Sequence, residues 1–204
     1  MARTSKNLPA EERKTVIVET VLSLAAEGKP SDITTAAIAE RMDLTQGALF
    51  RHFSTKDAIW KAVLDWVGKK LFARLEKAAA DAASPLEALE AIFLAHIAFA
   101  SEHPGAPRLL FSEFQRTEES SVRSLVHSLL GRYHQRIVSL LEEGKKVDEV
   151  DPALDSPCAA ALFIGAIQGL VLQSQVAEDH RDILLNAPEV FSIFRRGVER
   201  REGI

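Results

Sequence analysis

Residues 33–56 read ITTAAIAERMDLTQGALFRHFSTK. Ile38 and Met42 lie four residues apart, as do Leu49 and Phe53, so the stretch contains two short helices that each have an apolar face. The few residues between them leave room only for a tight turn. The stretch is therefore predicted to form a helix-turn-helix.

The outward positions of the second helix are small or polar. A helix that enters the DNA major groove needs small residues for close approach, and amide and guanidinium groups that reach base edges and phosphates. The residues at these positions are Thr45, Gln46, Gly47, Ala48, Arg51 and His52. Thr34 is interpreted as an N-cap, whereas Thr45 can serve both as an N-cap and as a DNA contact.

The order and spacing of these residues resemble the TetR family of bacterial transcriptional regulators. The similar segment covers about residues 9–67, from IVETVLSLAAEG through TQGALFRHF to STKDAIWKAV. The resemblance implies a three-helix helix-turn-helix DNA-binding domain at residues 1–56 and a helical ligand-binding and dimerisation domain at residues 57–204. It also implies that the fourth helix connects the two domains. Neither an enzymatic activity nor a cofactor is expected.

The resemblance also implies which residues contact DNA. These are Thr35, Thr45, Gln46, Gly47, Ala48, Phe50, Arg51, His52 and Lys56. Gln46 is the best candidate for base reading, because its amide can pair with both groups on the major-groove edge of adenine. Phe50 stands where the family often has tyrosine, so no hydroxyl is offered there. Asp43 replaces a common turn glycine, and aspartate tolerates the left-handed conformation.

Composition favours an all-α protein of about nine helices. The 204 residues are 47% hydrophobic but only 6% aromatic, and alanine and leucine, which favour helices, are abundant. Residues 1–70 hold 11 Lys and Arg against 9 Asp and Glu, whereas residues 71–204 hold 14 against 20. This asymmetry suits an N-terminal contact with nucleic acid but is too modest to predict one alone.

Capping and helix-breaking residues place the helices outside the helix-turn-helix. Ser84 followed by Pro85 is a strong helix start, and Gly144 is expected to end a long helix. The expected ranges are 9–28, 54–80, 84–102, 108–116, 118–143, 156–176 and 188–200.

Cys158 is the only cysteine, so an intrachain disulfide is excluded and a reducing, cytoplasmic location is expected. It lies in an apolar run and is predicted to be a buried structural thiol. That run, residues 157–172, falls short of the roughly 20 residues that span a bilayer. It is therefore predicted to be a buried helix, and no membrane association is expected.

A helix that is apolar on nearly all sides must be covered on all sides, which predicts a twofold homodimer built from the last two long helices. Gly165 and Gly169 are four apart and allow close helix approach, although they could equally serve packing within one subunit. The predicted interface residues are Phe163, Gly165, Ile167, Gly169, Leu170, Phe191 and Phe194.

A ligand pocket is expected in the middle helices, by family resemblance and because pockets combine apolar walls with a few polar groups. The candidate lining residues are Trp66, Phe93, His96, Ile97, Phe111, Phe114, His127 and Leu130, each of which could instead be an ordinary core residue. His127 and His134 are seven apart, about 10.5 Å along a helix, so they cannot share a metal ion. No metal site is predicted.

These observations predict a repressor that binds a pseudo-palindromic double-stranded operator as a homodimer. An unknown, largely hydrophobic small molecule would release it from DNA. Activation from the same scaffold stays open, because the sign of regulation depends on operator position. A ligand-sensing or protein-interaction module without sequence-specific DNA binding is the alternative from another functional class.

Overall fold

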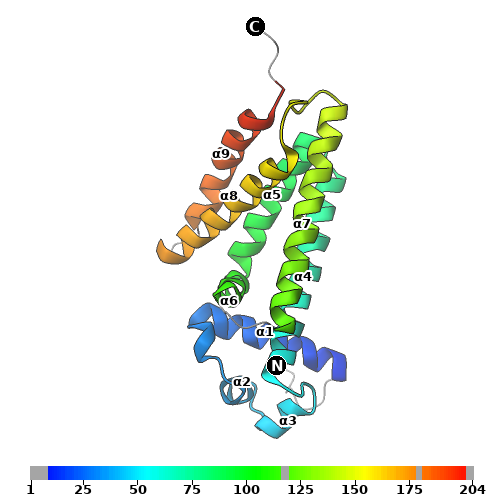
Figure 1. Cartoon of the computed structure of the whole chain (residues 1–204). Coiled ribbons are helices and arrows are strands. Elements are labelled where there is room, and N and C mark those ends of the chain that lie inside the picture. The colour runs from blue at the N-terminus through cyan, green and yellow to red at the C-terminus, as the bar shows by residue number, and fades with distance from the viewer. Residues whose placement is uncertain (1–8, 116–119, 178–180, 201–204) are drawn as a thin grey trace. The chain divides into compact units, whose positions relative to one another are not determined.

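The computed structural model describes residues 9–115, 120–177 and 181–200. These residues form nine α-helices and a short 3-10 helix, with no strand beyond one isolated bridge between Val150 and Glu199 (Figure 1). The elements are α1 (Ala10–Glu27), η2 (Pro30–Asp32), α2 (Thr35–Arg41), α3 (Gln46–Phe50), α4 (Lys56–Ala80), α5 (Pro85–Glu102), α6 (Gly105–Phe114), α7 (Ser121–Lys146), α8 (Ser156–Ala177) and α9 (Arg181–Val198). The predicted all-α fold is confirmed.

The helices gather into two compact units. The first comprises the described residues of 1–69 and 103–127, and the second those of 70–102 and 128–204. The first unit holds α1 to α3, the beginning of α4, and α6, which packs against α1. In this division α6 lies in the first unit together with α1.

The helix-turn-helix is built by local hydrogen bonds. The Thr34 and Thr45 hydroxyls accept from the backbone N–H groups of Ala37 and Ala48, at 3.1 and 3.2 Å, so both predicted N-caps are confirmed. In the turn, Asp43 has φ 53°, the left-handed conformation that its short polar side chain was expected to tolerate.

The α6 helix lies unusually close to α1. A Cβ atom added to Gly105 would lie 2.0 Å from the backbone oxygen of Leu22, so only glycine fits there. Arg108 donates to the carbonyl oxygen of Ala26 at 2.7 Å. The prediction that α6 begins at residue 108 is wrong. The helix starts at Gly105, whose close approach to α1 holds the first turn in place. The predicted end, at residue 116, lies outside the described residues.

The core of the second unit is aromatic. Phe93 of α5 packs against Phe163 of α8 and Phe191 of α9, with ring centroids 5.3 and 5.6 Å apart, and all three side chains are buried. Phe194 lies 5.3 Å from Phe163. The cluster holds α5, α8 and α9 together.

Two expected helix boundaries in this unit are wrong. The last helix starts at Arg181, and Pro188 lies inside it, because an apolar stripe continues on both sides of the proline. That stripe is Ile183, Ala187, Phe191, Phe194 and Val198, all buried. Gly144 does not end α7 but packs against Val150, and α7 continues to Lys146. Its predicted start, at residue 118, lies outside the described residues.

Candidate nucleic-acid interface

The α3 helix is fixed by buried side chains on one face. Leu49 and Ile38 are fully buried and Phe53 is nearly so, which confirms them as core residues. The opposite face is open, since Thr45, Gln46, Gly47, Phe50 and Arg51 are exposed. A short helix held in this way can present its outer face to a groove without unfolding.

Two residues on that face are more open than the fold requires. The Phe50 ring is 44% exposed, an unusual position for a large apolar side chain. A Cβ on Gly47 would meet nothing closer than the Thr45 hydroxyl oxygen, at 3.9 Å, so the fold itself does not require glycine. Both features suit a surface that a partner approaches closely.

Two predicted DNA contacts lie together. The Gln46 side-chain amide donates to the Thr35 hydroxyl at 3.2 Å, which joins the start of α3 to the start of α2. Within the described part of the chain the Gln46 side-chain carbonyl oxygen makes no hydrogen bond, so it can still accept one from a base. Ala36, beside Thr35, is exposed but carries no donor.

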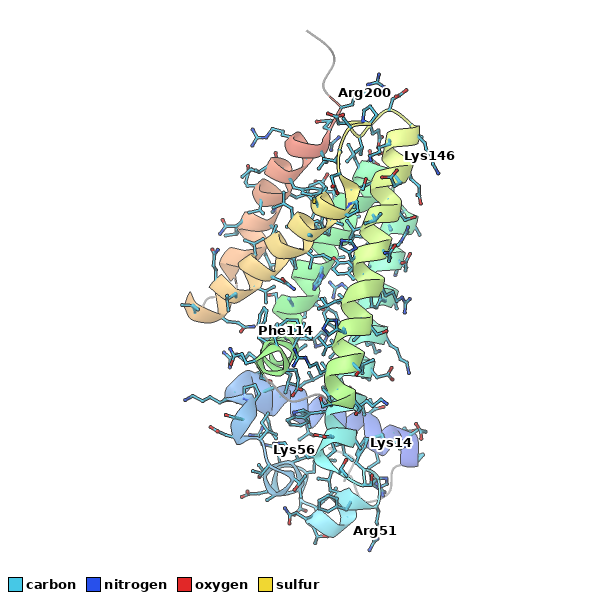
Figure 2. All side chains as sticks on the ribbon, viewed as in Figure 1. Lys14, Arg51, Lys56, Phe114, Lys146 and Arg200 are labelled. Atoms are coloured by element: carbon cyan, nitrogen blue, oxygen red, sulfur yellow. The ribbon has the colours of Figure 1, made fainter. Side chains whose placement is uncertain are left out.

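The cationic candidates differ in how they are held. The Lys56 ammonium lies 5.0 Å from the centre of the Trp60 ring, a cation–π contact that orients it. Arg51 is exposed and makes no ion pair with another described residue. Ala48 is half-buried between these groups and the core. Figure 2 shows Lys56 and Arg51 projecting from α4 and from the end of α3.

His52 is already engaged within the protein. Its Nε2 atom lies 3.2 Å from Nη1 of Arg13, which is on α1. Burial and then the charges of Arg13, Lys14 and Arg51 lower the pKa of His52. The sequence did not single out Arg13, because 39 residues separate it from its partner.

The family model for bacterial regulatory proteins of the tetR family matches residues 17–63, from the middle of α1 through the helix-turn-helix into α4. This segment is a TetR-type regulatory domain. TetR-family proteins are DNA-binding transcriptional regulators and are not enzymes.

Solved structures of TetR-type regulators share the fold over nearly the whole chain. The ketosteroid transcriptional regulator KstR2 of Mycobacterium tuberculosis superposes with a TM-score of 0.78 at 19% identity, covering 98% of this chain and 100% of that one. FadR from Bacillus subtilis, solved with stearoyl-CoA, gives 0.79 at 17% identity over 90% and 98% of the chains. Among curated sequences, the nucleoid occlusion factor SlmA of Marinomonas sp. is 25% identical over 78% of this chain and 81% of its own length.

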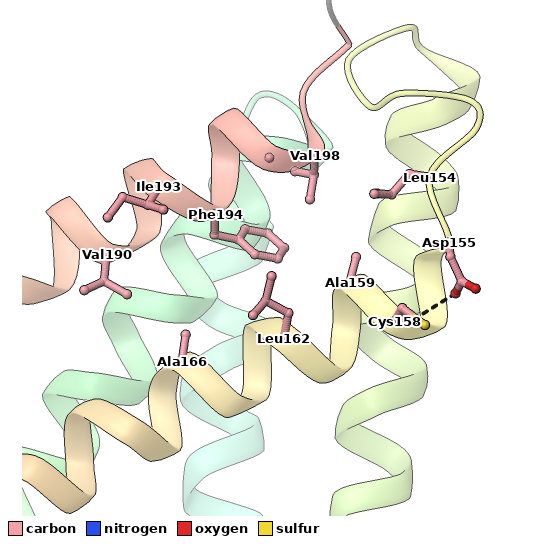
Figure 3. Close-up of a pocket in the computed structure, with 11 residues that line it drawn as sticks. Leu154, Asp155, Cys158, Ala159, Leu162, Ala166, Val190, Ile193, Phe194 and Val198 are labelled. Carbon is pink, nitrogen blue, oxygen red and sulfur yellow. Dashed lines mark hydrogen bonds between the residues drawn. The ribbon is translucent and has the colours of Figure 1, made fainter.

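The second unit of the chain carries an apolar groove between α8 and α9. Its volume is about 470 Å³, and Figure 3 shows side chains from both helices and from the preceding loop around it. The lining residues are Leu154, Asp155, Cys158, Ala159, Leu162, Ala166, Val190, Ile193, Phe194, Gly197 and Val198. Leu162 and Ile193 are each 63% exposed.

The predicted interface residues divide into two groups. Phe163, Ile167, Phe191 and Phe194 are buried within the chain, so their side chains offer little surface to a second copy, although Phe194 also lines the groove. Gly165 is exposed, and Gly169 and Leu170 are half-exposed. The outward stripe of α8 consists instead of Cys158, Ala161, Leu162, Gly165, Gly169, Leu172 and Val176, which recur at helical spacing.

The expectation that α8 is a buried helix is also corrected. Over Ser156–Val176 it is long and apolar enough to cross a membrane by length and composition, and only 39% of that window is buried. One such helix is weak support for a membrane span, because core helices pass the same test. Here α8 packs against α5 and α9 on one side, which leaves an apolar face uncovered.

Cys158 is exposed, contrary to the expected buried thiol. Its thiol contacts the Asp155 carboxylate (Figure 3), and that hydrogen bond and charge raise the pKa of Cys158. Because the thiolate is the reactive form, this environment makes Cys158 a poor nucleophile. Nothing here favours a redox role.

The predicted pocket residues do not line the groove. Phe93, His96, Ile97 and Leu130 belong to the second unit, and Trp66, Phe111, Phe114 and His127 to the first. Phe93 and Ile97 are fully buried in the core, whereas His127 and Phe114 are exposed. Trp66 packs edge-on against His103, and the Phe111 ring lies tilted against Phe114. Among the described residues, no group of three or more His, Cys, Asp or Glu could hold a metal ion.

His96 has a polar partner that the sequence analysis missed. Its Nδ1 atom lies 3.0 Å from the hydroxyl of Tyr133, the only tyrosine of the chain. Tyr133 in turn packs edge-on against Phe72 and Phe163. Burial raises the pKa of Tyr133 far above its usual range and lowers that of His96 to about 4. This neutral pair lies in an otherwise apolar interior.

Stability should fall in acid because of His96. The pKa is about 4 in the folded chain and about 6.5 in the unfolded one, so between these values the unfolded state binds more protons. The contribution of neutral His96 to the free energy of unfolding is complete above pH 6.5 and is lost as the pH falls towards 4. Between pH 7.5 and 5.0 the free energy of unfolding should decrease by about 2 kcal/mol from this group. Urea unfolding at pH 7.5 and at pH 5.0 measures this change in the free energy of unfolding.

His96→Gln should remove most of that difference, whereas replacing an exposed histidine, His127→Gln, should not. An equal decrease in stability in wild type and His96→Gln would show that other groups cause the acid sensitivity.

Proposed function

We propose that the protein is a homodimeric repressor that binds a pseudo-palindromic operator and is released by a small, largely hydrophobic molecule. The observation that carries the DNA-binding part is the open face of α3, polar and small, on a helix held by Leu49 and Phe53. In a dimer, two such helices enter successive major grooves, with half-site centres about 34–36 Å apart or a multiple of that. The protein acts in the cytoplasm, where its operator lies.

The division of labour on DNA follows from chemistry. Gln46 reads a base, and Arg51, Lys56 and Thr35 bind phosphates and set the register. Phe50 contributes apolar contact with sugar or a thymine methyl group. Thr45, Gly47, Ala48 and His52 complete the surface that faces DNA.

The exposed groove between α8 and α9 supports the dimer. A Cβ on Gly165 or Gly169 would meet no atom within 4 Å, so packing inside the chain does not require either glycine. Close approach of a second α8 explains both, with Leu162 and Ile193 covering the groove. An exposed apolar surface of this extent is typical of an association site.

Gln46→Ala should reduce discrimination between the operator and a scrambled duplex by roughly tenfold per half-site. An amide that pairs with adenine contributes about 1–3 kcal/mol of discrimination, and some is offset because Gln46 must leave Thr35. Fluorescence anisotropy with both labelled duplexes measures the two affinities.

Lys56→Ala is the matched control for that experiment. It should weaken binding to both duplexes by the same factor and lower the salt dependence by about one unit per half-site, because it removes one phosphate contact from each subunit. Unchanged sequence preference in Gln46→Ala would contradict its assignment as the base reader.

The ligand part rests on the second unit. His96 and Tyr133 form a neutral polar pair among buried aromatic rings, next to Phe93 and Phe72. A pocket that opened there would offer apolar walls with two hydrogen-bonding groups, which suits a hydrophobic molecule with one polar end. The names of two solved TetR-type structures point the same way, since they mention a ketosteroid regulator and stearoyl-CoA.

Release follows from linkage. A ligand that binds better to the form that does not fit DNA must weaken DNA binding by the same factor. The α4 helix runs from Lys56 into the second unit and is the element that can connect the two events.

The first test is anisotropy on DNA from directly upstream of the gene, with a scrambled duplex and varied salt. Specific binding, roughly a thousandfold tighter than to the control, supports a regulator. Equal, weak binding to this and to other genomic fragments favours a sensing or interaction module. Reporter transcription with and without the protein separates repression from activation.

A further inference from the structure

Arg13 fixes the protonation state of His52. Arginine can only donate hydrogen bonds, so Nε2 of His52 accepts from Nη1 of Arg13 at 3.2 Å and carries no proton. The ring is therefore neutral, with its proton on Nδ1. It follows that His52 cannot donate to a DNA phosphate through Nε2 while this bond exists.

Positive charge gathers around that neutral ring. Arg13, Lys14 and Arg51 all lie close enough to lower the pKa of His52, and they come from α1 and from the end of α3. Lys14 also forms an ion pair with Glu11 at 2.8 Å at the surface. Like charges repel one another in the free protein, and an anion between them relieves that repulsion.

We propose that Arg13, Lys14, Arg51 and His52 form a binding site for a DNA backbone phosphate beside the reading face of α3. Within it, Arg13 and Arg51 bind the phosphate, and His52 is a positioning residue that holds the Arg13 guanidinium in place. Helix α1, which has no part in base reading, thereby adds a backbone contact to the interface. The proposal rests on DNA binding as the proposed function.

The geometry explains why His52 is suited to positioning. An arginine side chain loses considerable rotamer freedom when it binds, and a guanidinium already held by a hydrogen bond loses less. His52 is itself half-buried. Its backbone N–H donates to the carbonyl oxygen of the buried Leu49 at 3.0 Å, which fixes the position of His52. The bond therefore ties Arg13 to a fixed part of the helix-turn-helix.

The test compares Arg13→Ala, His52→Ala, the double variant and His52→Gln by anisotropy on operator and scrambled duplexes over a range of salt. Arg13→Ala should weaken binding to both duplexes by the same factor, about fivefold per half-site, and lower the salt dependence by about one unit per half-site. His52→Ala should reproduce this loss, and the double variant should lose no more than Arg13→Ala. His52→Gln should retain most of the affinity, because its amide oxygen can accept from Arg13.

Lys77→Ala is the charge-matched control, since Lys77 lies on α4 about 30 Å along the helix from Lys56. Thermal unfolding verifies that each variant is folded. An unchanged salt dependence in Arg13→Ala overturns the phosphate site, and additive losses in the double variant overturn the positioning role. If neither wild type nor Lys77→Ala preferred the operator, the proposed function as a specific regulator would be wrong. The salt dependence of binding to the scrambled duplex would still test the phosphate site.

Discussion

Replacing Leu162 and Ile193 together by glutamate is expected to produce folded monomers that bind the operator about a hundredfold more weakly. Both side chains are 63% exposed in the single chain, so the substitutions leave its own core intact. In a dimer they would place four carboxylates in an apolar contact without partners, at a cost of several kcal/mol. Operator affinity falls because the second helix-turn-helix is no longer tethered to the first.

Size-exclusion chromatography with light scattering gives the mass, and anisotropy gives the operator affinity of the same sample. Val147→Glu is the matched control, because Val147 is 56% exposed but lies outside the groove. A folded Leu162→Glu/Ile193→Glu protein that remains dimeric would place the interface elsewhere. A monomer with undiminished affinity would contradict the two-headed mode of binding.

The helix-turn-helix could be predicted from the sequence because its determinants are local. Thr45 caps the helix that follows it, Asp43 takes the left-handed conformation within the turn, and Leu49 with Phe53 forms the inward face. Each of these features depends on residues within a few positions. The match to the family model covers the same segment.

The exposed face of α8 could not be predicted, because this helix is apolar on nearly all sides. Phe163 and its neighbour Leu162 look equivalent in sequence, yet one is buried and the other is 63% exposed. Periodicity distinguishes the sides of a helix only where polar residues mark one of them. Phe163 is buried because it packs against Phe93 on α5, a residue distant in sequence.

Long-range polar pairs were missed for a related reason. Tyr133 is 37 residues from His96, and Arg13 is 39 residues from His52, so no local spacing links the partners. Pro188 shows the opposite failure: a strong local rule predicted a helix start, and the apolar stripe from Ile183 to Val198 overrode it.

Gly105→Ala is expected to destabilise the protein by about 3 kcal/mol, although alanine normally favours a helix. The new Cβ would lie 2.0 Å from the Leu22 carbonyl oxygen and 3.0 Å from the Ala26 amide nitrogen. Both are backbone atoms inside α1, so neither can rotate away, and α6 must move off α1. For a chain of this size, the midpoint of thermal unfolding should fall by roughly 10 °C.

Gly131→Ala provides a control of opposite sign. Gly131 lies within α7, and a Cβ there would meet no atom within 4 Å. The same substitution should therefore stabilise the protein by about 0.5–1 kcal/mol, through helix propensity alone. Circular dichroism melts of both variants measure the difference. If Gly105→Ala matched or exceeded the stability of wild type, the close contact between α6 and α1 would not exist in solution. Helix α1 would then lack the support that α6 gives it through Gly105 and Arg108.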